Sequence, residues 1–168
     1  MAQRMHTVYI GLGSNKGNLK GNIRKAMDAL ARIPGVRVVT FSPLYVTSPI
    51  GPRQRGFLNA AAKIRTSLLP EELLAELQHI EKEMGRPVRH AVWGPRVIDL
   101  DILLYGRISV RRLRLSIPHP EMHRRRFVIE PMADIAPGLS HPLLHKSMRK
   151  LRENLWLTSP EQKVRILK

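Results

Sequence analysis

One short segment constrains the fold of this chain more than any other. Residues 97–105 are apolar except for two acids, Asp99 and Asp101, which stand two positions apart. In a strand, residues two apart project from the same face with their side-chain roots roughly 7 Å apart, and the residues between them face the opposite side. The segment therefore predicts a strand with two carboxylates on one face and a core-forming face on the other. The core-forming residues are Ile98, Leu100 and Ile102.

The two carboxylates need compensation, because like charges at this spacing repel and are costly to place against apolar packing. Oxygen ligands favour a hard ion such as Mg²⁺, which commonly takes one or two carboxylates and completes its shell with waters and substrate phosphates. The chain has no cysteine, which excludes a disulfide, a thiolate metal centre and a thiol nucleophile. The residues predict a metal site, and an exposed strand face neutralised by surface arginines is the alternative.

Strands and helices alternate irregularly along the rest of the chain. Apolar patterns and Pro/Gly breaks predict helices over residues 18–33, 70–84 and 146–155. They predict strands over residues 7–12, 36–46, 57–65, 97–105, 127–129 and 163–167, and a loop over 118–126. Pro43 marks an edge strand or a bulge. This mixture predicts an α+β fold with a largely antiparallel sheet, and a ferredoxin-like β-α-β-β-α-β core accounts for about the first hundred residues.

Length and composition favour one domain. The chain has 168 residues, of which 43% are hydrophobic and 25% are charged, as is typical of globular proteins. We expect a single domain over residues 1–168 with a basic tail at 156–168. No apolar run reaches the ~18 residues that span a bilayer, and the first residues lack the features of a secretory signal. We therefore expect a cytoplasmic protein with no membrane partner.

The formal net charge of +16 predicts an anionic partner, and nucleic acid, anionic lipid and a polyphosphate substrate all satisfy it. Guanidinium groups bind phosphate oxygens in pairs, so arginines that converge on the two acids would form a polyphosphate site. Taken singly, each arginine is better explained as part of the solvated surface. The arginines concerned are Arg86, Arg89 and Arg96 around residues 93–95, and Arg114, Arg124, Arg125 and Arg126 around His119 and His123.

The helix predicted over residues 70–84 contains a second anomaly. At 100° per residue, Glu81 falls inside the apolar stripe and Gln78 lies at its edge. A carboxylate that faces a sheet needs a partner. An acid in a salt bridge at the helix end is the alternative, and the sequence does not choose between the two.

Several sequence blocks occur in order through roughly residues 6–145. They are residues 9–15 (YIGLGSN), 45–51 (YVTSPIG), 57–61 (FLNAA), 80–81 with 85–86 (IE and GR), 93–103 (WGPRVIDLDIL), and 118–120 (PHP) followed by Arg125 and Phe127. Together these blocks resemble the hydroxymethyl-dihydropterin pyrophosphokinase family of folate biosynthesis. The resemblance implies a three-layer αβα fold with a ferredoxin-like core, acting as a monomer. It also implies ATP-dependent transfer of a pyrophosphoryl group to the hydroxymethyl oxygen of 6-hydroxymethyl-7,8-dihydropterin, with release of AMP and no specific nucleic-acid partner.

The resemblance implies roles for individual residues as well. Asp99 and Asp101 resemble the ligands of two Mg²⁺ ions, and Arg86 and Arg96 resemble the arginines that act with them in catalysis. The implied ATP-binding residues are Gln78, Glu81, Arg86, Arg96, Ile102, Arg114, Ser116, His119 and Arg125. The implied pterin-binding residues are Thr47, Pro49, Ile50, Phe57, Asn59 and Phe127, with the two phenylalanines on either side of the flat ring. Val92 departs from the family pattern, which has Lys or Arg before Trp93.

Two other functions are compatible with parts of the sequence. A basic RNA-binding module shares the β-α-β-β-α-β order and the positive charge. However, aromatic residues make up 5% of the chain, too few for a stacking platform. A non-catalytic interaction protein leaves the paired acids unexplained. Formation of AMP from ATP and the reduced pterin distinguishes the enzyme from both alternatives.

Overall fold

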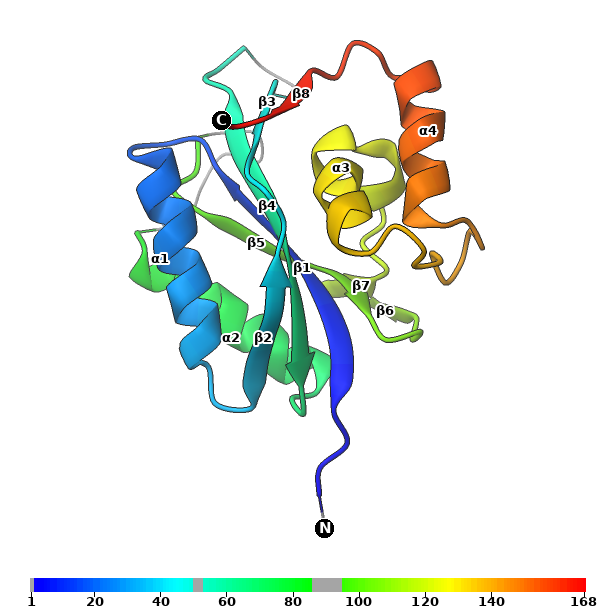
Figure 1. Ribbon diagram of the computed structural model, residues 1–168. Helices are drawn as coiled ribbons and strands as arrows, with labels where there is room; N and C mark the ends of the chain where they lie inside the picture. The colour runs from blue at the N-terminus through cyan, green and yellow to red at the C-terminus, as the bar shows by residue number, and fades with distance from the viewer. Residues whose placement is uncertain (1, 50–52, 86–94) are drawn as a thin grey trace.

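A computed structural model describes residues 2–49, 53–85 and 95–168 of the chain, arranged as a sheet with helices on both faces (Figure 1). The main sheet contains β1 (His6–Ser14), β2 (Val36–Phe41), β3 (Tyr45–Thr47), β4 (Phe57–Thr66), β5 (Asp99–Tyr105) and β8 (Val164–Ile166). A separate hairpin consists of β6 (Val110–Arg112) and β7 (Leu115–Ile117). The helices are α1 (Leu19–Arg32), α2 (Pro70–Glu83), α3 (Arg126–Ile135) and α4 (Met148–Thr158), with a 3₁₀ turn at Met122–Arg124.

The strand order produces the ferredoxin-like topology. β1 lies between β5 and β4, and the described pairings are antiparallel in the order β5-β1-β4-β3-β8. β2 and β3 pair with different parts of β4 and are separated by residues 42–44. This interruption contains Pro43, which lacks the N–H that a strand ladder uses. The α+β prediction with an antiparallel sheet is confirmed.

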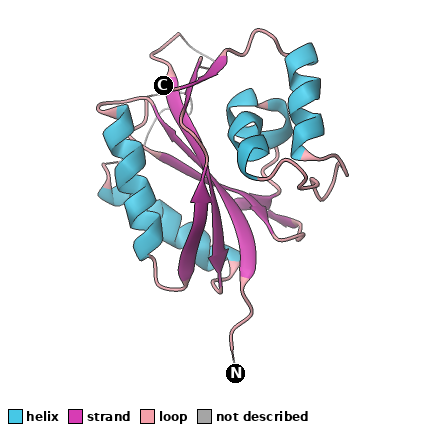
Figure 2. Ribbon diagram, in the orientation of Figure 1, coloured by secondary structure: helices cyan, strands magenta, loops and turns pink. Residues whose placement is uncertain are grey.

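Helices α1 and α2 cover one face of the sheet, and α3 and α4 cover the other (Figures 1 and 2). Each face has its own hydrophobic cluster. The first contains Ile23 and Leu77 from α1 and α2, and the second contains Met132 and Leu151 from α3 and α4. Full burial of one large apolar side chain stabilises a fold by about 1.5–3 kcal/mol. These clusters hold the three layers together and confirm the αβα prediction.

Local signals set the starts of the first two helices. The side chain of Asn18 accepts a hydrogen bond from the N–H of Gly21 at 3.0 Å, and α1 begins directly after this cap. Pro70 occupies the first position of α2, where its missing N–H costs nothing. The carboxylate of Glu72 accepts from the N–H of Leu69 at 2.7 Å. Both helices therefore begin close to the predicted positions.

The strand predicted over residues 127–129 is wrong, because these residues belong to α3. The predicted loop at 118–126 contains the 3₁₀ turn and the first residue of the same helix. The β-branched pair Val128-Ile129 and the nearby Pro131 disfavour a helix locally. Tertiary packing overrides this preference, since Val128, Ile129, Met132 and Ala133 all enter the second hydrophobic cluster with helical spacing.

The last predicted helix and strand are confirmed as α4 and β8. The C-terminal residues therefore extend the sheet, because β8 pairs with β3. Among the helices in the described part of the chain, none is long and apolar enough to cross a membrane.

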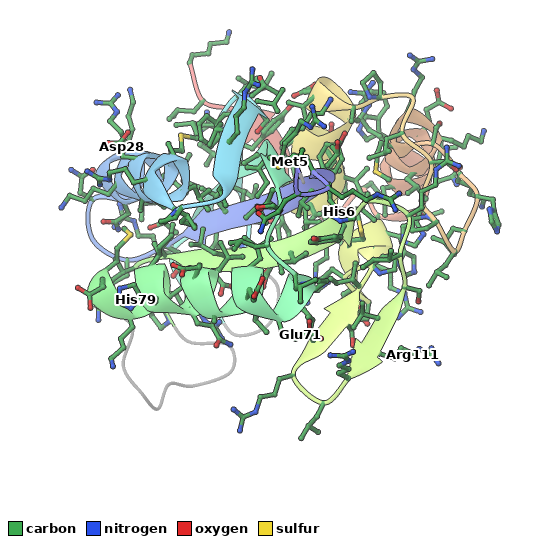
Figure 3. The ribbon with its side chains drawn as sticks, turned by 90° about the horizontal axis from the view of Figure 1, so that it is seen from below. Met5, His6, Asp28, Glu71, His79 and Arg111 are labelled. Carbon is green, nitrogen blue, oxygen red and sulfur yellow. The ribbon has the colours of Figure 1, made fainter. Side chains whose placement is uncertain are left out.

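The β6–β7 hairpin is held against α2. Arg112 in the hairpin forms an ion pair with Glu71 in the first turn of α2. Figure 3 shows Glu71 at the end of α2 that lies nearest to the hairpin. Leu115 and Ile117 of β7 are buried in the first hydrophobic cluster. These contacts fix the hairpin turn, which carries Arg114.

Candidate active site

A cavity of about 490 Å³ lies at the edge of the sheet formed by β5. Its wall combines residues from β1, β3, β4, β5, α2 and the start of α3 with residues from the connecting segments. Twelve of the residues predicted from the sequence line it. They are Thr47, Phe57, Asn59, Gln78, Glu81, Arg96, Asp99, Asp101, Arg114, His119, Arg125 and Phe127.

Other predicted residues are not part of this wall. Ile102 is buried in the first hydrophobic cluster, because it alternates with Asp101 along β5. Ser116 is exposed on β7 and lines a second cavity of about 310 Å³. Pro49 is half-buried outside the wall of the first cavity. The roles of these three residues stay predictions. Arg86 and Ile50, as well as Arg89, Val92 and Trp93, lie outside the described residues.

The register of three strands explains how the acids come to share a cavity with Asn59. Asp99 on β5 pairs with Gly13 on β1, and Gly13 pairs with Asn59 on β4. Directly paired residues of an antiparallel sheet project from the same face. Gly13 carries no side chain, and a Cβ atom placed there would lie 2.9 Å from Nδ2 of Asn59. The glycine therefore leaves room for the amide of Asn59, which a side chain at this position would displace.

The two acids have the arrangement predicted for a strand with two unlike faces. Asp99 and Asp101 line the cavity, whereas Ile98, Leu100 and Ile102 are buried in the first hydrophobic cluster. Nη1 of Arg96 donates to Oδ1 of Asp99 at 3.2 Å, and the Arg96 side chain is 16% exposed. The arginine that accompanies the acids is thus a cavity residue. An ion pair with an arginine also agrees with the alternative of a strand face neutralised by arginines, so the role of the two acids as metal ligands stays a prediction.

Helix α2 contributes polar side chains to the cavity from the face of the sheet opposite to α3 and α4. Glu81 is 4% exposed, as its position in the apolar stripe predicts, and Gln78 is exposed one turn earlier. Both residues line the cavity together with Leu74. The burial of Glu81 confirms its position in the apolar stripe. Burial is compatible both with a role in the cavity and with a salt bridge at the helix end, so the role of this carboxylate stays a prediction.

His119 supplies a neutral hydrogen-bond donor to the cavity. Nδ1 of His119 accepts from the N–H of Glu121 at 3.2 Å, which leaves the proton of a neutral ring on Nε2. Burial, and next the positive charge of Arg125, lower the pKa of His119 to about 4 from its ordinary value of 6.5. The imidazole is therefore uncharged near neutral pH.

We expect the replacement His119→Gln to flatten the acid side of the stability profile of the unliganded protein. Between about pH 4 and 6.5 the unfolded chain binds a proton at His119 that the folded protein does not, so this residue makes stability fall as pH falls through that window. Urea unfolding between pH 4 and 7 measures the effect. An unchanged pH dependence in the variant would contradict it. Some pH dependence of stability should remain in the variant because of His141, since burial also lowers the pKa of that residue.

The other end of the cavity has aromatic and amide groups. Phe57 at the start of β4 and Phe127 in the first turn of α3 both line it. Oγ1 of Thr47 donates to Oδ1 of Asn59 at 2.7 Å, and Nδ2 of Asn59 is directed towards the carbonyl of Leu12 at 3.5 Å. Asn59 is 6% exposed. These contacts fix the orientation of its amide.

Sequence reasoning assigned no role to Asn15, which connects the two ends of the site. Its N–H donates to the carbonyl of Arg96 at 3.0 Å, and its Oδ1 accepts from the N–H of Arg96 at 2.6 Å. Its Nδ2 donates to Oε1 of Gln54 at 2.8 Å. The residue is 2% exposed. Its place directly after a strand, among turn-forming residues, was the available signal, but its partners are distant in the sequence.

Comparison of the sequence with known proteins identifies its family. The profile of the 7,8-dihydro-6-hydroxymethylpterin-pyrophosphokinase family matches residues 9–137. The chain belongs to this family. A Pseudomonas aeruginosa protein named 2-amino-4-hydroxy-6-hydroxymethyldihydropteridine pyrophosphokinase is 48% identical over 136 residues, which cover 80% of this chain and 83% of the relative. A Haemophilus influenzae protein of the same name is 47% identical over 139 residues, covering 82% of this chain and 86% of the relative.

Solved structures with little sequence identity to this pyrophosphokinase family member have the same fold. A Plasmodium falciparum HPPK-DHPS structure with pteroate superposes with a TM-score of 0.77 at 14% identity. The match covers 96% of this chain and 46% of the Plasmodium chain, so the present protein spans less than half of that longer chain. At this level of identity the likeness establishes the fold alone.

Proposed function

We propose that this protein transfers a pyrophosphoryl group from ATP to the hydroxymethyl group of 6-hydroxymethyl-7,8-dihydropterin and releases AMP, a step of folate biosynthesis. The observation that carries the proposal is the composition of the cavity of about 490 Å³ beside β5. Its wall contains two acids, several arginines and a neutral histidine. It also contains two phenylalanines and the amide of Asn59. A substrate with a polyphosphate and a flat heterocycle matches this distribution of groups.

The heterocycle belongs at the aromatic end. We place the pterin ring between Phe57 and Phe127, because flat rings gain several contacts and favourable quadrupole interactions beside aromatic side chains. The amide of Asn59, held by Thr47 at 2.7 Å, then reads the hydrogen-bonding edge of the ring.

The triphosphate belongs at the cationic end. Arg96, Arg114 and Arg125 line the cavity there. Their guanidinium groups form paired, charge-assisted hydrogen bonds with phosphate oxygens. The neutral His119 adds a donor on Nε2 without adding a charge. Gln78 and Glu81 on α2 lie where the nucleoside of ATP would reach the wall, and we assign Arg86 to the same site by its place in the family pattern.

The two acids are suitable ligands for Mg²⁺, and we propose that two Mg²⁺ ions bind at this site. Asp99 and Asp101 offer oxygen ligands only, and the described residues contain no group of three or more His, Cys, Asp and Glu that could hold a metal ion. An ion at this site would complete its shell with waters and phosphate oxygens, as Mg²⁺ commonly does. When bound, Mg²⁺ neutralises phosphate charge and lowers the pKa of a nearby hydroxyl group.

Positioning accounts for what the protein itself contributes to the reaction. The hydroxymethyl oxygen loses its proton to solvent and forms a bond to the β-phosphorus. The bond between that phosphorus and the oxygen of the α-phosphate breaks, and AMP leaves with that oxygen. No covalent protein intermediate is needed. The arginines hold the chain of phosphates in line with the hydroxymethyl group, and the aromatic pair holds the pterin that carries it.

Nucleotide analysis tests the proposed function. The protein is mixed with ATP, Mg²⁺ and the reduced pterin, and the products are separated by ion exchange. We expect AMP to form in proportion to the pterin consumed. Accumulation of ADP would indicate transfer of a single phosphoryl group, and unchanged ATP would favour the RNA-binding or interaction protein; either result would contradict the proposal.

We also propose that the enzyme is a monomer that works in the cytoplasm without a specific nucleic-acid partner. The monomer is the state that the resemblance to the family implies. The ATP triphosphate accounts for an anionic partner of the basic residues at the site. The use of ATP as co-substrate supports a cytoplasmic location, because ATP is available there.

A further inference from the structure

The C-terminal segment contacts both sides of the proposed pterin site, although it lies beyond the residues that match the family profile. After α4 ends at Thr158, the chain passes the N-terminal end of α3 and enters the sheet as β8 beside β3 (Figure 1). Two consecutive residues of this segment, Gln162 and Lys163, make the contacts that matter here.

The side chain of Gln162 replaces a helix cap at the start of α3. Arg125, the capping residue of α3, makes no side-chain hydrogen bond to the helix. Instead, Oε1 of Gln162 accepts from the N–H of Arg126 at 2.8 Å. Nε2 of the same amide donates to the carbonyl of Arg124 at 2.9 Å. One side chain thus holds the backbone on both sides of Arg125 and directly before Phe127.

A largely buried ion pair reinforces this contact. Nη1 of Arg126 donates to the carbonyl of Gln162 at 2.8 Å, and Nη2 donates to Glu130 at 3.0 Å. The side chains of Arg126 and Glu130 are 16% and 10% exposed. Glu130 also accepts a hydrogen bond from Nε1 of Trp156 in α4. The first turn of α3 is therefore fixed to the C-terminal segment by both side-chain and backbone groups.

The next residue fixes the opposite wall of the site. The N–H of Lys163 donates to Oγ of Ser48 at 3.1 Å, and its carbonyl accepts from the N–H of Ser48 at 3.0 Å. Val164 pairs with Thr47, whose hydroxyl holds Asn59. Adjacent residues of one segment thus connect the wall that carries Phe127 to the wall that carries Thr47.

We propose that Gln162 is a positioning residue for pterin binding, acting through Phe127 and Arg125. The inference rests on the proposed function, because it concerns the substrate that the aromatic end of the cavity would hold. Phe127 is one of two phenylalanine rings that line the cavity, whereas Arg125, whose guanidinium group lies over the Phe127 ring at 5.6 Å from its centroid, is one of three described arginines that line it. Loss of the Gln162 amide should therefore weaken the binding of the pterin more than the binding of ATP.

Three variants of the full chain test this role. Gln162→Met keeps the length and volume of the side chain without its amide, and Gln162→Ala removes both. The matched control is Glu161→Met, which changes the exposed neighbour in the same turn. For both Gln162 variants we expect the KM for the reduced pterin to rise about tenfold, the scale of losing one or two hydrogen bonds. The KM for ATP should stay within about twofold, and the control should match the wild type.

Calorimetric titration with 6-hydroxymethyl-7,8-dihydropterin repeats the comparison without turnover, and melting temperatures report on the fold. A selective loss of pterin affinity in both Gln162 variants supports the proposal. Wild-type affinity in either variant overturns it, and so do equal losses for pterin and ATP, which indicate a general loosening of the structure. If the wild type binds the pterin but makes no AMP, the proposed function fails while the titration still decides the role of Gln162.

Discussion

Replacing Asp99 or Asp101 with alanine is expected to lower turnover by about two orders of magnitude or more while leaving the fold intact. Both carboxylates line the cavity from one face of β5, and each would hold Mg²⁺ against the phosphates. Loss of such a group removes charge neutralisation that is needed most in the transition state. The apolar face of β5 is unchanged in these variants, so the core keeps its packing.

Initial rates at limiting and saturating Mg²⁺, together with melting temperatures, measure this effect. The matched control is Asp28→Ala, which removes a carboxylate from the exposed face of α1 (Figure 3). We expect the control to keep the turnover of the wild type. Near-normal turnover of either cavity variant at limiting Mg²⁺ would contradict the assignment of the two acids as metal ligands.

Replacing Phe57 or Phe127 with alanine is expected to weaken pterin binding about tenfold. Each ring would cover one face of the pterin, and the loss of an aromatic contact costs about 1 kcal/mol beyond the buried area. The affinity for ATP should change less, because we assign the triphosphate to the arginines and the acids. Phe127→Ala should affect ATP more than Phe57→Ala does, since the guanidinium group of Arg125 lies over the Phe127 ring at 5.6 Å from its centroid. Isothermal titration with each substrate measures the two affinities separately.

The remaining phenylalanine of the chain provides the control. Phe41 lies on β2 and packs against the first hydrophobic cluster, on the far side of the sheet from the proposed pterin. Phe41→Ala should lower the melting temperature without a selective loss of pterin affinity. If Phe57→Ala or Phe127→Ala reduced both affinities equally, the change would reflect a damaged fold, and the stacking role should be abandoned.

Periodicity was sufficient to predict the parts of the site that depend on a single element. The alternation of residues 97–105 placed both acids on one face, and the helical stripe of α2 placed Glu81 towards the sheet. Both predictions follow from the fixed geometry of strands and helices. Neither pattern reveals which other strand faces the acids. The row Asp99, Gly13, Asn59 exists only because β1 lies between β5 and β4.

Contacts between distant segments account for what the sequence could not show. The helix at residues 126–135 depends on packing against the second hydrophobic cluster, which outweighs the local preference of its β-branched residues. The bonds of Asn15 to Gln54 and Arg96 span 39 and 81 positions of the chain. Gln162 reaches back 36 positions to Arg126. No periodic signal links residues at such separations.

The fate of the β-phosphate tests the central claim most directly. The protein is incubated with Mg²⁺, the reduced pterin and ATP that carries ³²P in its β-phosphate, and the products are separated. Pyrophosphoryl transfer predicts that the label leaves the nucleotide with the γ-phosphate and is recovered in the pterin product, while the AMP is unlabelled. Label that remains in ADP would mean that only the γ-phosphate is transferred, and it would contradict the reaction proposed for this cavity.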